Sequence, residues 1–198
     1  MQAEGTRFRA GVEIGVDIAW DDLRSRYDAV IGATGATVPR DLPIPGRDLL
    51  GVHFAMEYLV QANRVGAGDS VAEQIVAEGK HVVVLGGGDT GADCIGTAHR
   101  QQALSVTNLA IGVRPPTERA DHQPWPMDPT LFEVSSAHEE GGERVYLAST
   151  VEFLSNEAGE VRAIRVAETE YIDGRRVPKS GTERDIPADL VLLALGFT

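Results

Sequence analysis

A strand that runs directly into a glycine-rich turn and then into a helix constrains the fold of this chain more than any other feature. The segment is HVVVLGGGDTGADCIGTAHR, residues 81–100. Residues 82–85 are apolar, as in a strand buried on both faces, and residues 92, 95 and 98 recur at helical spacing. Gly86, Gly88 and Gly91 have the G-x-G-x-x-G spacing of a dinucleotide-binding turn.

Each of these glycines has its own physical role. Gly86 permits the tight turn, Gly88 lets the backbone approach a pyrophosphate, and Gly91 lets the helix pack closely on the strand. The free N–H groups of a helix beginning near Asp89 would bind the phosphates. The competing interpretation is a flexible turn without a ligand. The expected cofactor-binding loop comprises Gly86, Gly87, Gly88, Asp89, Thr90 and Gly91.

The charge balance limits the partners of the chain. Its 198 residues include 18 basic and 30 acidic side chains, for a net charge of −12, which excludes nucleic acid and anionic membrane surfaces. The N-terminus has no signal-peptide pattern and no apolar run reaches the length of a membrane span, so we expect a cytoplasmic protein. The single cysteine, Cys94, cannot form an internal disulfide or a Cys-only metal site, and its place in the helix predicts burial.

The other apolar patterns predict an α/β fold: a Rossmann-like domain with a central parallel sheet and an antiparallel β-meander. The expected helical segments are residues 52–64 and a short turn over 71–77. The expected strands are residues 105–111, 144–154, a hairpin of 161–171 with 175–177 around Asp173-Gly174, and one buried strand within 186–198.

The first 46 residues do not resemble the start of a domain. Tyr27–Ala33 is predicted to be a buried strand, preceded by two short strands in residues 6–11 and 12–18. Such strands without a covering helix cannot bury a core of their own. The proline-rich segment PRDLPIPG, residues 39–46, reads as a linker. We therefore divide the chain into residues 1–46 and 47–198.

The end of the second strand favours NADP over NAD. An NAD site usually places an acidic residue there, about 20 residues beyond the glycines, to bind the ribose 2′-hydroxyl. Residues 108–111 contain no acid, whereas Arg114 and Arg119 follow in the next loop. A guanidinium can bind a 2′-phosphate through two hydrogen bonds. The alternative is that both arginines are ordinary solvated loop residues.

Other catalytic patterns are absent from the sequence. The five histidines are scattered without metal-ligand spacing, no G-x-S-x-G turn exists, and Cys94 has no evident base partner. We nominate no catalytic side chain and no metal ligand.

Five blocks together resemble a known family. YDAVIGATGA, LPIPGRDLLGVHFAMEYL, HVVVLGGGDTGADCIGT, RPPTERA with PWP, and IPADLVLLALGF are similar to the small (β) subunit of NADPH-dependent glutamate synthase. The resemblance covers nearly the whole chain. It implies a flavoprotein with two dinucleotide-binding domains, in which the NADPH domain is inserted into the FAD domain. It also implies hydride transfer from NADPH to FAD, with the electrons passing through iron–sulfur clusters to a large subunit that makes glutamate from glutamine and 2-oxoglutarate.

The resemblance also implies roles for two short segments. Ala33, Thr34 and Gly35 would lie near the flavin, and Ala194, Leu195 and Gly196 would close the nicotinamide end of the NADPH site. The cysteine-rich segment and the FAD glycine fingerprint of the family are absent, as is the second FAD segment that follows the Gly-Phe pair. We therefore expect a fragment: an NADPH-binding domain (47–198) with a remnant of an FAD-binding domain (1–46) that lacks most of what would hold FAD.

Three functions remain open from the sequence. The first is an electron-input module of glutamate synthase or of a similar flavin-linked oxidoreductase. The second is a dinucleotide-binding fragment without turnover, and the third is a module that holds a partner subunit through the loop of residues 114–129. A homodimer that covers the unpaired strands also stays open.

Overall fold

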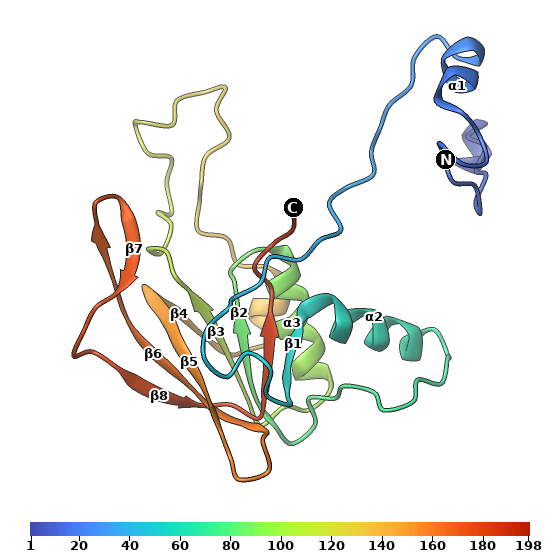
Figure 1. Ribbon diagram of the computed structural model, residues 1–198. Coiled ribbons are helices and arrows are strands. Elements are labelled where there is room, and N and C mark those ends of the chain that lie inside the picture. Colours follow the sequence, from blue (N-terminus) through green and yellow to red (C-terminus); the bar gives the residue numbers. More distant parts are fainter. The chain divides into compact units, whose positions relative to one another are not determined.

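A five-stranded parallel sheet lies at the centre of residues 37–198 in the computed structural model, which describes residues 1–198. Its strands are β1 (Val52–Phe54), β2 (His81–Leu85), β3 (Ser105–Ala110), β4 (Glu143–Tyr146) and β9 (Leu190–Leu193). They stand in the order β1-β9-β2-β3-β4, and every neighbouring pair is parallel (Figure 1). The predicted strands at 81–85 and 105–111 are confirmed.

Both faces of this sheet are buried, and the side chains of successive residues pack on opposite faces. Val82 and Val84 of β2 pack on the helical side, whereas Val83 and Leu85 pack on the opposite side. β9 repeats the pattern, and all four of its residues are buried. Continuous apolar runs are what a parallel sheet covered on both faces requires.

Helices cover one face of the sheet. They are α2 (Ala55–Gly66), α3 (Asp89–Arg100) and the short α4 (Ser136–Glu139). Tyr58 of α2 and Ile95 of α3 are almost fully buried in the same cluster as Val82. The predicted helix after the glycine turn is confirmed. The predicted helix at 52–64 is right from Ala55 onward, but its first three residues form β1 because they pair with β9.

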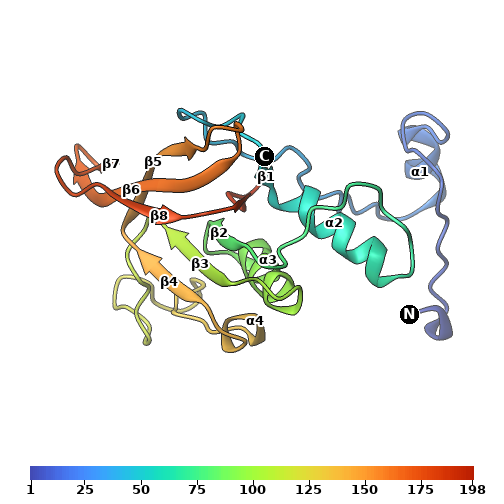
Figure 2. The ribbon, with the colours of Figure 1, turned by 90° about the horizontal axis from the view of Figure 1, so that it is seen from below.

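An antiparallel sheet covers the other face (Figure 2). Its strands are β5 (Ala148–Ser155), β6 (Val161–Ile172), β7 (Arg175–Pro178) and β8 (Arg184–Pro187), with β6 pairing all three others. The predicted hairpin is confirmed: Asp173 and Gly174 turn between β6 and β7 with φ of 50° and 75°. Phe153, Ile164 and Val166 of this sheet pack in one cluster with Val83.

Two predicted strands are wrong because each one is in fact two strands, one in the parallel sheet and one in the antiparallel sheet. Residues 144–154 break at Leu147, which has a φ of 54° and donates its N–H to the carbonyl of Gly112, so β4 and β5 lie in different sheets. Residues 186–198 break at Asp189, between β8 and β9. The Asp189 carboxylate accepts a 2.9 Å hydrogen bond from the His81 N–H and thereby directs the chain into the parallel sheet.

The predicted helical turn at 71–77 is also wrong, for a local reason. The N–H of Ile75 donates to the Gln61 side chain at 2.8 Å, and the N–H of Ala77 donates to the Gln101 side chain at 2.9 Å. These side-chain amides replace the carbonyls that would accept within a helix.

Residues 1–36 form a separate unit. It contains a 3₁₀ turn (Gln2–Glu4) and helix α1 (Trp20–Arg26). The predicted strands at 6–11, 12–18 and 27–33 are wrong: only an isolated bridge joins Ile14 to Ile18, and Ile31 is 88% exposed. An apolar run becomes a buried strand only where neighbouring strands accept its hydrogen bonds, and this unit supplies none.

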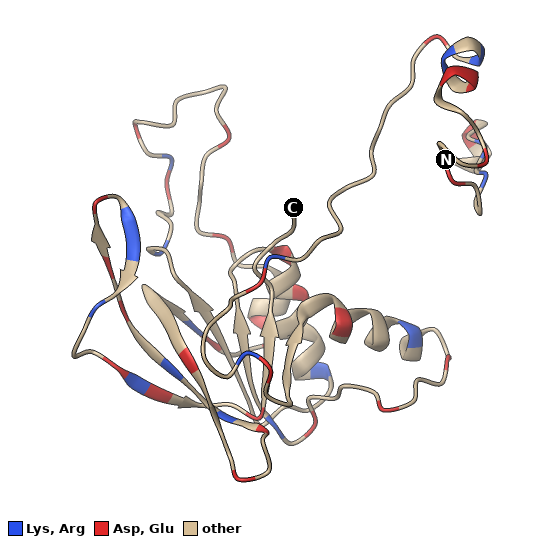
Figure 3. Ribbon diagram, in the orientation of Figure 1, with Lys and Arg blue, Asp and Glu red and all other residues tan.

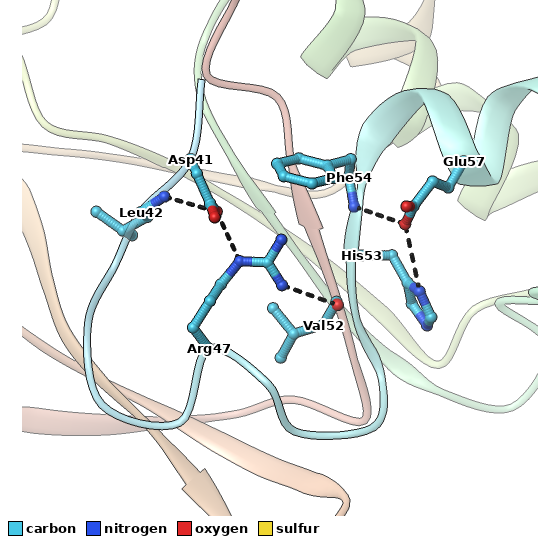
Figure 4. Close-up of polar contacts among 7 residues, drawn as sticks. All are labelled: Asp41, Leu42, Arg47, Val52, His53, Phe54 and Glu57. Carbon is cyan, nitrogen blue, oxygen red and sulfur yellow. Dashed lines mark hydrogen bonds and ion pairs between the residues drawn. The ribbon is translucent and has the colours of Figure 1, made fainter. Parts of the chain in front are cut away.

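The proline-rich segment, residues 39–46, belongs to the compact unit of residues 37–198. Asp41 accepts hydrogen bonds from Arg47 Nε at 2.6 Å and from the Leu42 N–H at 2.8 Å (Figure 4). The Arg47 guanidinium holds the pKa of that carboxyl below its usual value and lies 4.7 Å from the Phe54 ring centroid. This cluster closes the loop before β1 and holds Leu42 against the core.

The two-sided burial predicts unequal effects along β6. Ile164 is fully buried between the sheets, whereas Ile172 on the same strand is 51% exposed. We expect Ile164→Ala to lower the free energy of unfolding in urea by about 2–5 kcal/mol, through lost contacts and a residual cavity. The matched Ile172→Ala variant should lower it by less than about 1 kcal/mol. Equal effects would contradict the layer assignment.

Candidate functional site

A cavity of about 670 Å³ opens at the carboxyl ends of the parallel strands. The strand order reverses between β2 and β9, because β3 follows β2 on one side and β9 returns on the other. Ligands of open α/β sheets bind at such a reversal. The glycine loop, the residues after β9 and the residues after β3 line the cavity on the side of the parallel sheet, and β5 and β7 contribute the facing wall.

Gly86 is the tightest point of this site. It has a φ of 119°, and a Cβ built on it would lie 2.1 Å from the carbonyl oxygen of Ala194. Its N–H donates to the carbonyl of Leu109 at 3.0 Å, so the residue after β2 is clamped between the ends of β9 and β3. Only glycine fits this position.

Asn108 fixes the other side of the Gly86 peptide. Its side-chain amide donates to the carbonyl of Gly86 at 2.7 Å and to that of Val84 at 3.1 Å, and the residue is only 3% exposed. A buried amide with two partners orients the backbone to which it binds. Asn108 is one of the residues 108–111 that contain no acid, and the apolar pattern of β3 gives no signal that its side chain points back to the glycine loop.

Packing within the chain requires glycine at position 91 but not at position 88. A Cβ on Gly91 would lie 2.5 Å from the carbonyl oxygen of Gly86, so this glycine permits the close approach of α3. Gly88, at the N-cap of α3, has an ordinary φ of −89°, and a Cβ there would meet no atom within 4 Å. The fold therefore needs glycine at 86 and 91 but not at 88.

The predicted segment after β9 does meet the glycine loop. The N–H of Ala194 donates to the carbonyl of Leu85 at 2.8 Å, and Ala194, Leu195 and Gly196 all line the cavity. Gly196 accepts a 2.9 Å hydrogen bond from the Arg40 N–H. Leu42, held by the Asp41–Arg47 pair, lines the same end of the cavity.

The structure does not bring Arg114 and Arg119 into this cavity. The guanidinium carbon of Arg114 lies 4.0 Å from the Phe132 ring centroid. Arg119 donates to the carbonyls of Gln123 and Met127, at 2.8 Å each, within its own loop. The cationic side chain that does line the cavity is Arg176 of β7, which the sequence analysis missed because it lies in a hairpin far from the glycine loop along the chain.

A second cavity, of about 450 Å³, adjoins the glycine loop on another side. It shares Gly87, Gly88 and Asp89 with the first cavity and extends to Arg144 and Tyr146 of β4. The Arg144 Nε and the Tyr146 hydroxyl are buried without a hydrogen-bond partner in the chain. The loop therefore has open space on both sides of α3's first residues.

The remaining predicted residues lie elsewhere. Ala33, Thr34 and Gly35 belong to the unit of residues 1–36, and a Cβ on Gly35 would meet no atom within 4 Å. No group of three or more His, Cys, Asp or Glu side chains is placed to hold a metal ion. None of the helices is both long enough and apolar enough to cross a bilayer.

Cys94 of α3 is fully buried, as predicted, in the core cluster on the helical side of the parallel sheet. Burial, together with the nearby Asp93 carboxylate, raises the pKa of its thiol to about 12.

The glycine geometry predicts separate effects on folding. We expect Gly86→Ala to lower the free energy of unfolding by more than about 1 kcal/mol, because the methyl group collides with the Ala194 carbonyl at a positive φ. Gly88→Ser should change it by less than about 0.5 kcal/mol, because serine is a good N-cap and finds open space. Chemical denaturation measures both. A stable Gly86→Ala variant would contradict the clamp.

The raised thiol pKa predicts a dependence on pH. At neutral pH the folded chain should react with a thiol reagent only as fast as it unfolds. Above about pH 8.5 the unfolded thiol loses its proton while the folded thiol keeps it, so the unfolded state binds fewer protons and stability falls as pH rises. Chemical denaturation at pH 8 and at pH 10 should show a smaller fall in the free energy of unfolding for Cys94→Ala than for the wild type. Parallel curves for the two proteins would contradict this.

Comparison with known proteins agrees with the fold and with the predicted resemblance. Residues 10–198 match the family described as pyridine nucleotide-disulphide oxidoreductase. FprA, an oxidoreductase of Mycobacterium tuberculosis solved in complex with NADPH, has a similar fold, with a TM-score of 0.57 at 20% identity. The match covers 94% of this chain and 54% of FprA.

The relatives in sequence are glutamate synthases. The glutamate synthase [NADPH] small chain of M. tuberculosis is 52% identical over 202 residues, which cover all of this chain and 41% of the relative. That of Bacillus subtilis is 39% identical, over 98% of this chain and 42% of the relative. The glutamate synthase [NADH] of Schizosaccharomyces pombe is 45% identical, over 98% of this chain and 10% of the relative. The chain thus spans about two fifths of the length of the bacterial relatives, and their names confirm the resemblance.

Proposed function

Because this chain belongs to the pyridine nucleotide-disulphide oxidoreductase family, we propose that residues 37–198 bind NADPH as the electron-input domain of a glutamate synthase. The resemblance to the small chains supports the assignment to that enzyme, in which the electrons serve glutamate formation from glutamine and 2-oxoglutarate. The cavity at the end of β2 supports the binding of a nucleotide.

The observation that carries the proposal is Gly88. The fold needs the glycines at 86 and 91, but the chain itself offers a side chain at 88 nothing but open space. A glycine at this position is explained by a ligand that approaches the backbone, as a pyrophosphate does at the second glycine of a dinucleotide-binding turn. The residues of the glycine loop therefore fit a bound pyrophosphate.

The chain positions the cofactor rather than performing chemistry of its own. The N–H groups at the N-terminus of α3 would hold the pyrophosphate, supported by the helix dipole. Asn108 and Ala194 would keep the glycine loop in the conformation that presents those groups. Ala194, Leu195 and Gly196 would lie against the nicotinamide half. When bound, NADPH supplies a hydride, and this transfer needs no acid or base from the protein.

The flavin does not fit the residues present in the same way. Ala33–Gly35, which the resemblance would place near FAD, carry no cradle: a Cβ on Gly32 or Gly35 would meet no atom within 4 Å. Residues 27–33 also have no pairing strand. The iron–sulfur clusters that the resemblance implies have no set of cysteine ligands among these residues, since the one cysteine, Cys94, is buried in the core.

A large-subunit partner follows from the same assignment. The loop of residues 114–129 gives this proposal a surface, because Trp125 is 83% exposed and Met127 is 53% exposed. The loop is held by its own hydrogen bonds, from Arg119 to Gln123 and Met127 and from the Thr130 N–H to the Gln123 side chain. A preordered loop with an exposed aromatic residue suits a protein interface.

Calorimetric titration with NADPH and NADH tests the proposal. We expect micromolar binding of NADPH and binding of NADH that is weaker by about tenfold, as a charged phosphate contact implies. Gly88→Arg should abolish both, because its side chain would occupy the space of the pyrophosphate, while its circular dichroism spectrum stays that of the wild type. Failure of the folded wild-type chain to bind either nucleotide would overturn the proposal.

A further inference from the structure

Arg176 is the one cationic side chain that lines the large cavity, and it comes from the antiparallel sheet. It stands on β7, where two consecutive arginines give the blue stretch in Figure 3. In register it lies opposite Tyr171 of β6, whose hydroxyl accepts a hydrogen bond from the Arg176 Nε at 3.3 Å. This contact holds the guanidinium by one edge.

The other edge of the guanidinium faces the end of β3. Arg176 Nη2 lies 3.8 Å from the position that a Cβ on Gly112 would take. Gly112 follows β3 closely, and β3 pairs in register with β2 up to Leu109 opposite Leu85. Gly112 thus lies at the same edge of the sheet as the glycine loop, where an adenosine ribose falls when the pyrophosphate binds at the neighbouring helix N-terminus.

The charge of Arg176 is not used within the chain. It makes no ion pair with any carboxylate, unlike Arg47, Arg64, Arg100 and Arg165. Its Nη groups donate no hydrogen bond in the protein, since Nε to Tyr171 is its one side-chain contact of this kind. In a chain with a net charge of −12, a guanidinium without a carboxylate partner that lines the same cavity as the glycine loop is a preformed donor for a phosphate.

The other arginines near the loop are engaged differently. Arg119 donates hydrogen bonds to carbonyls of its own loop, and the guanidinium of Arg114 lies over the Phe132 ring. Arg144 borders the second cavity, where it donates to the carbonyl of Glu133 at 2.9 Å and lies 4.8 Å from the Phe132 ring.

From these contacts we propose that Arg176 is a specificity-determining residue of the nucleotide site: its Nη groups bind the 2′-phosphate of the adenosine ribose. The inference rests on the proposed function, because it requires a dinucleotide at the glycine loop. It assigns the preference for NADPH over NADH to the antiparallel sheet rather than to the loop that follows β3.

The test titrates the whole chain and its variants with NADPH, NADH, adenosine 2′,5′-bisphosphate and AMP by calorimetry. We expect Arg176→Gln to lower the affinity for NADPH and for the bisphosphate by about tenfold or more. The affinities for NADH and AMP should fall by less than about twofold. Arg176→Lys should fall between, because it keeps the charge but loses the planar fork. Arg175→Gln is the matched control, since the neighbouring side chain on β7 points to the opposite face, and it should leave all four affinities unchanged.

The outcomes separate this inference from the proposed function. A wild-type chain that binds none of the four ligands overturns both. Tight, NADPH-selective binding that survives Arg176→Gln overturns the inference alone, and selectivity lost instead in Arg114→Gln or Arg144→Gln assigns the contact to that residue. Equal losses of NADPH and NADH in Arg176→Gln, with an unchanged thermal melting curve, would show a general effect on the site and also overturn it.

Discussion

The close contact between Gly86 and the end of β9 is the constraint on which the rest of the site depends. Because the Gly86 Cα lies against the Ala194 carbonyl, the chain can turn sharply after β2 and start α3 directly above the sheet edge. The Leu109 carbonyl and the Asn108 amide hold the same peptide from the side of β3. Three parallel strands thereby fix the conformation of the loop that we propose binds a pyrophosphate, and a loop that is already ordered loses little conformational entropy when a ligand binds.

This contact requires β9 to reach the centre of the sheet, although it comes last in the chain. The antiparallel sheet makes that possible, because β4 leaves the parallel sheet at Leu147 and the chain returns at Asp189 after β5 to β8. The same excursion covers the second face of the parallel sheet and brings Arg176 over the cavity. One insertion thus supplies core packing and the inferred phosphate contact together.

Much of the fold around the glycine loop could be predicted from the sequence, because it depends on patterns among residues that are close along the chain. The apolar run at 82–85, the glycine spacing and the helical period after it identified β2, the loop and α3, and Asp173-Gly174 identified the β6–β7 turn. The strand predicted at 27–33 failed because its apolar residues have no partner strand in residues 1–36. The helical turn predicted at 71–77 failed because Gln61 and Gln101 capture its N–H groups from outside the segment.

The sequence by itself determined the α/β class, the glycine loop and the family resemblance, since each depends on neighbouring residues and on spacing along the chain. Only the tertiary structure decided that Gly88, unlike Gly86 and Gly91, is not required by the fold, because this depends on the distances from an added Cβ to atoms of other strands. It also decided which arginine borders the cavity: Arg176 reaches Gly112 through a sheet that folds back over the strand ends, and separation along the chain carries no record of that approach.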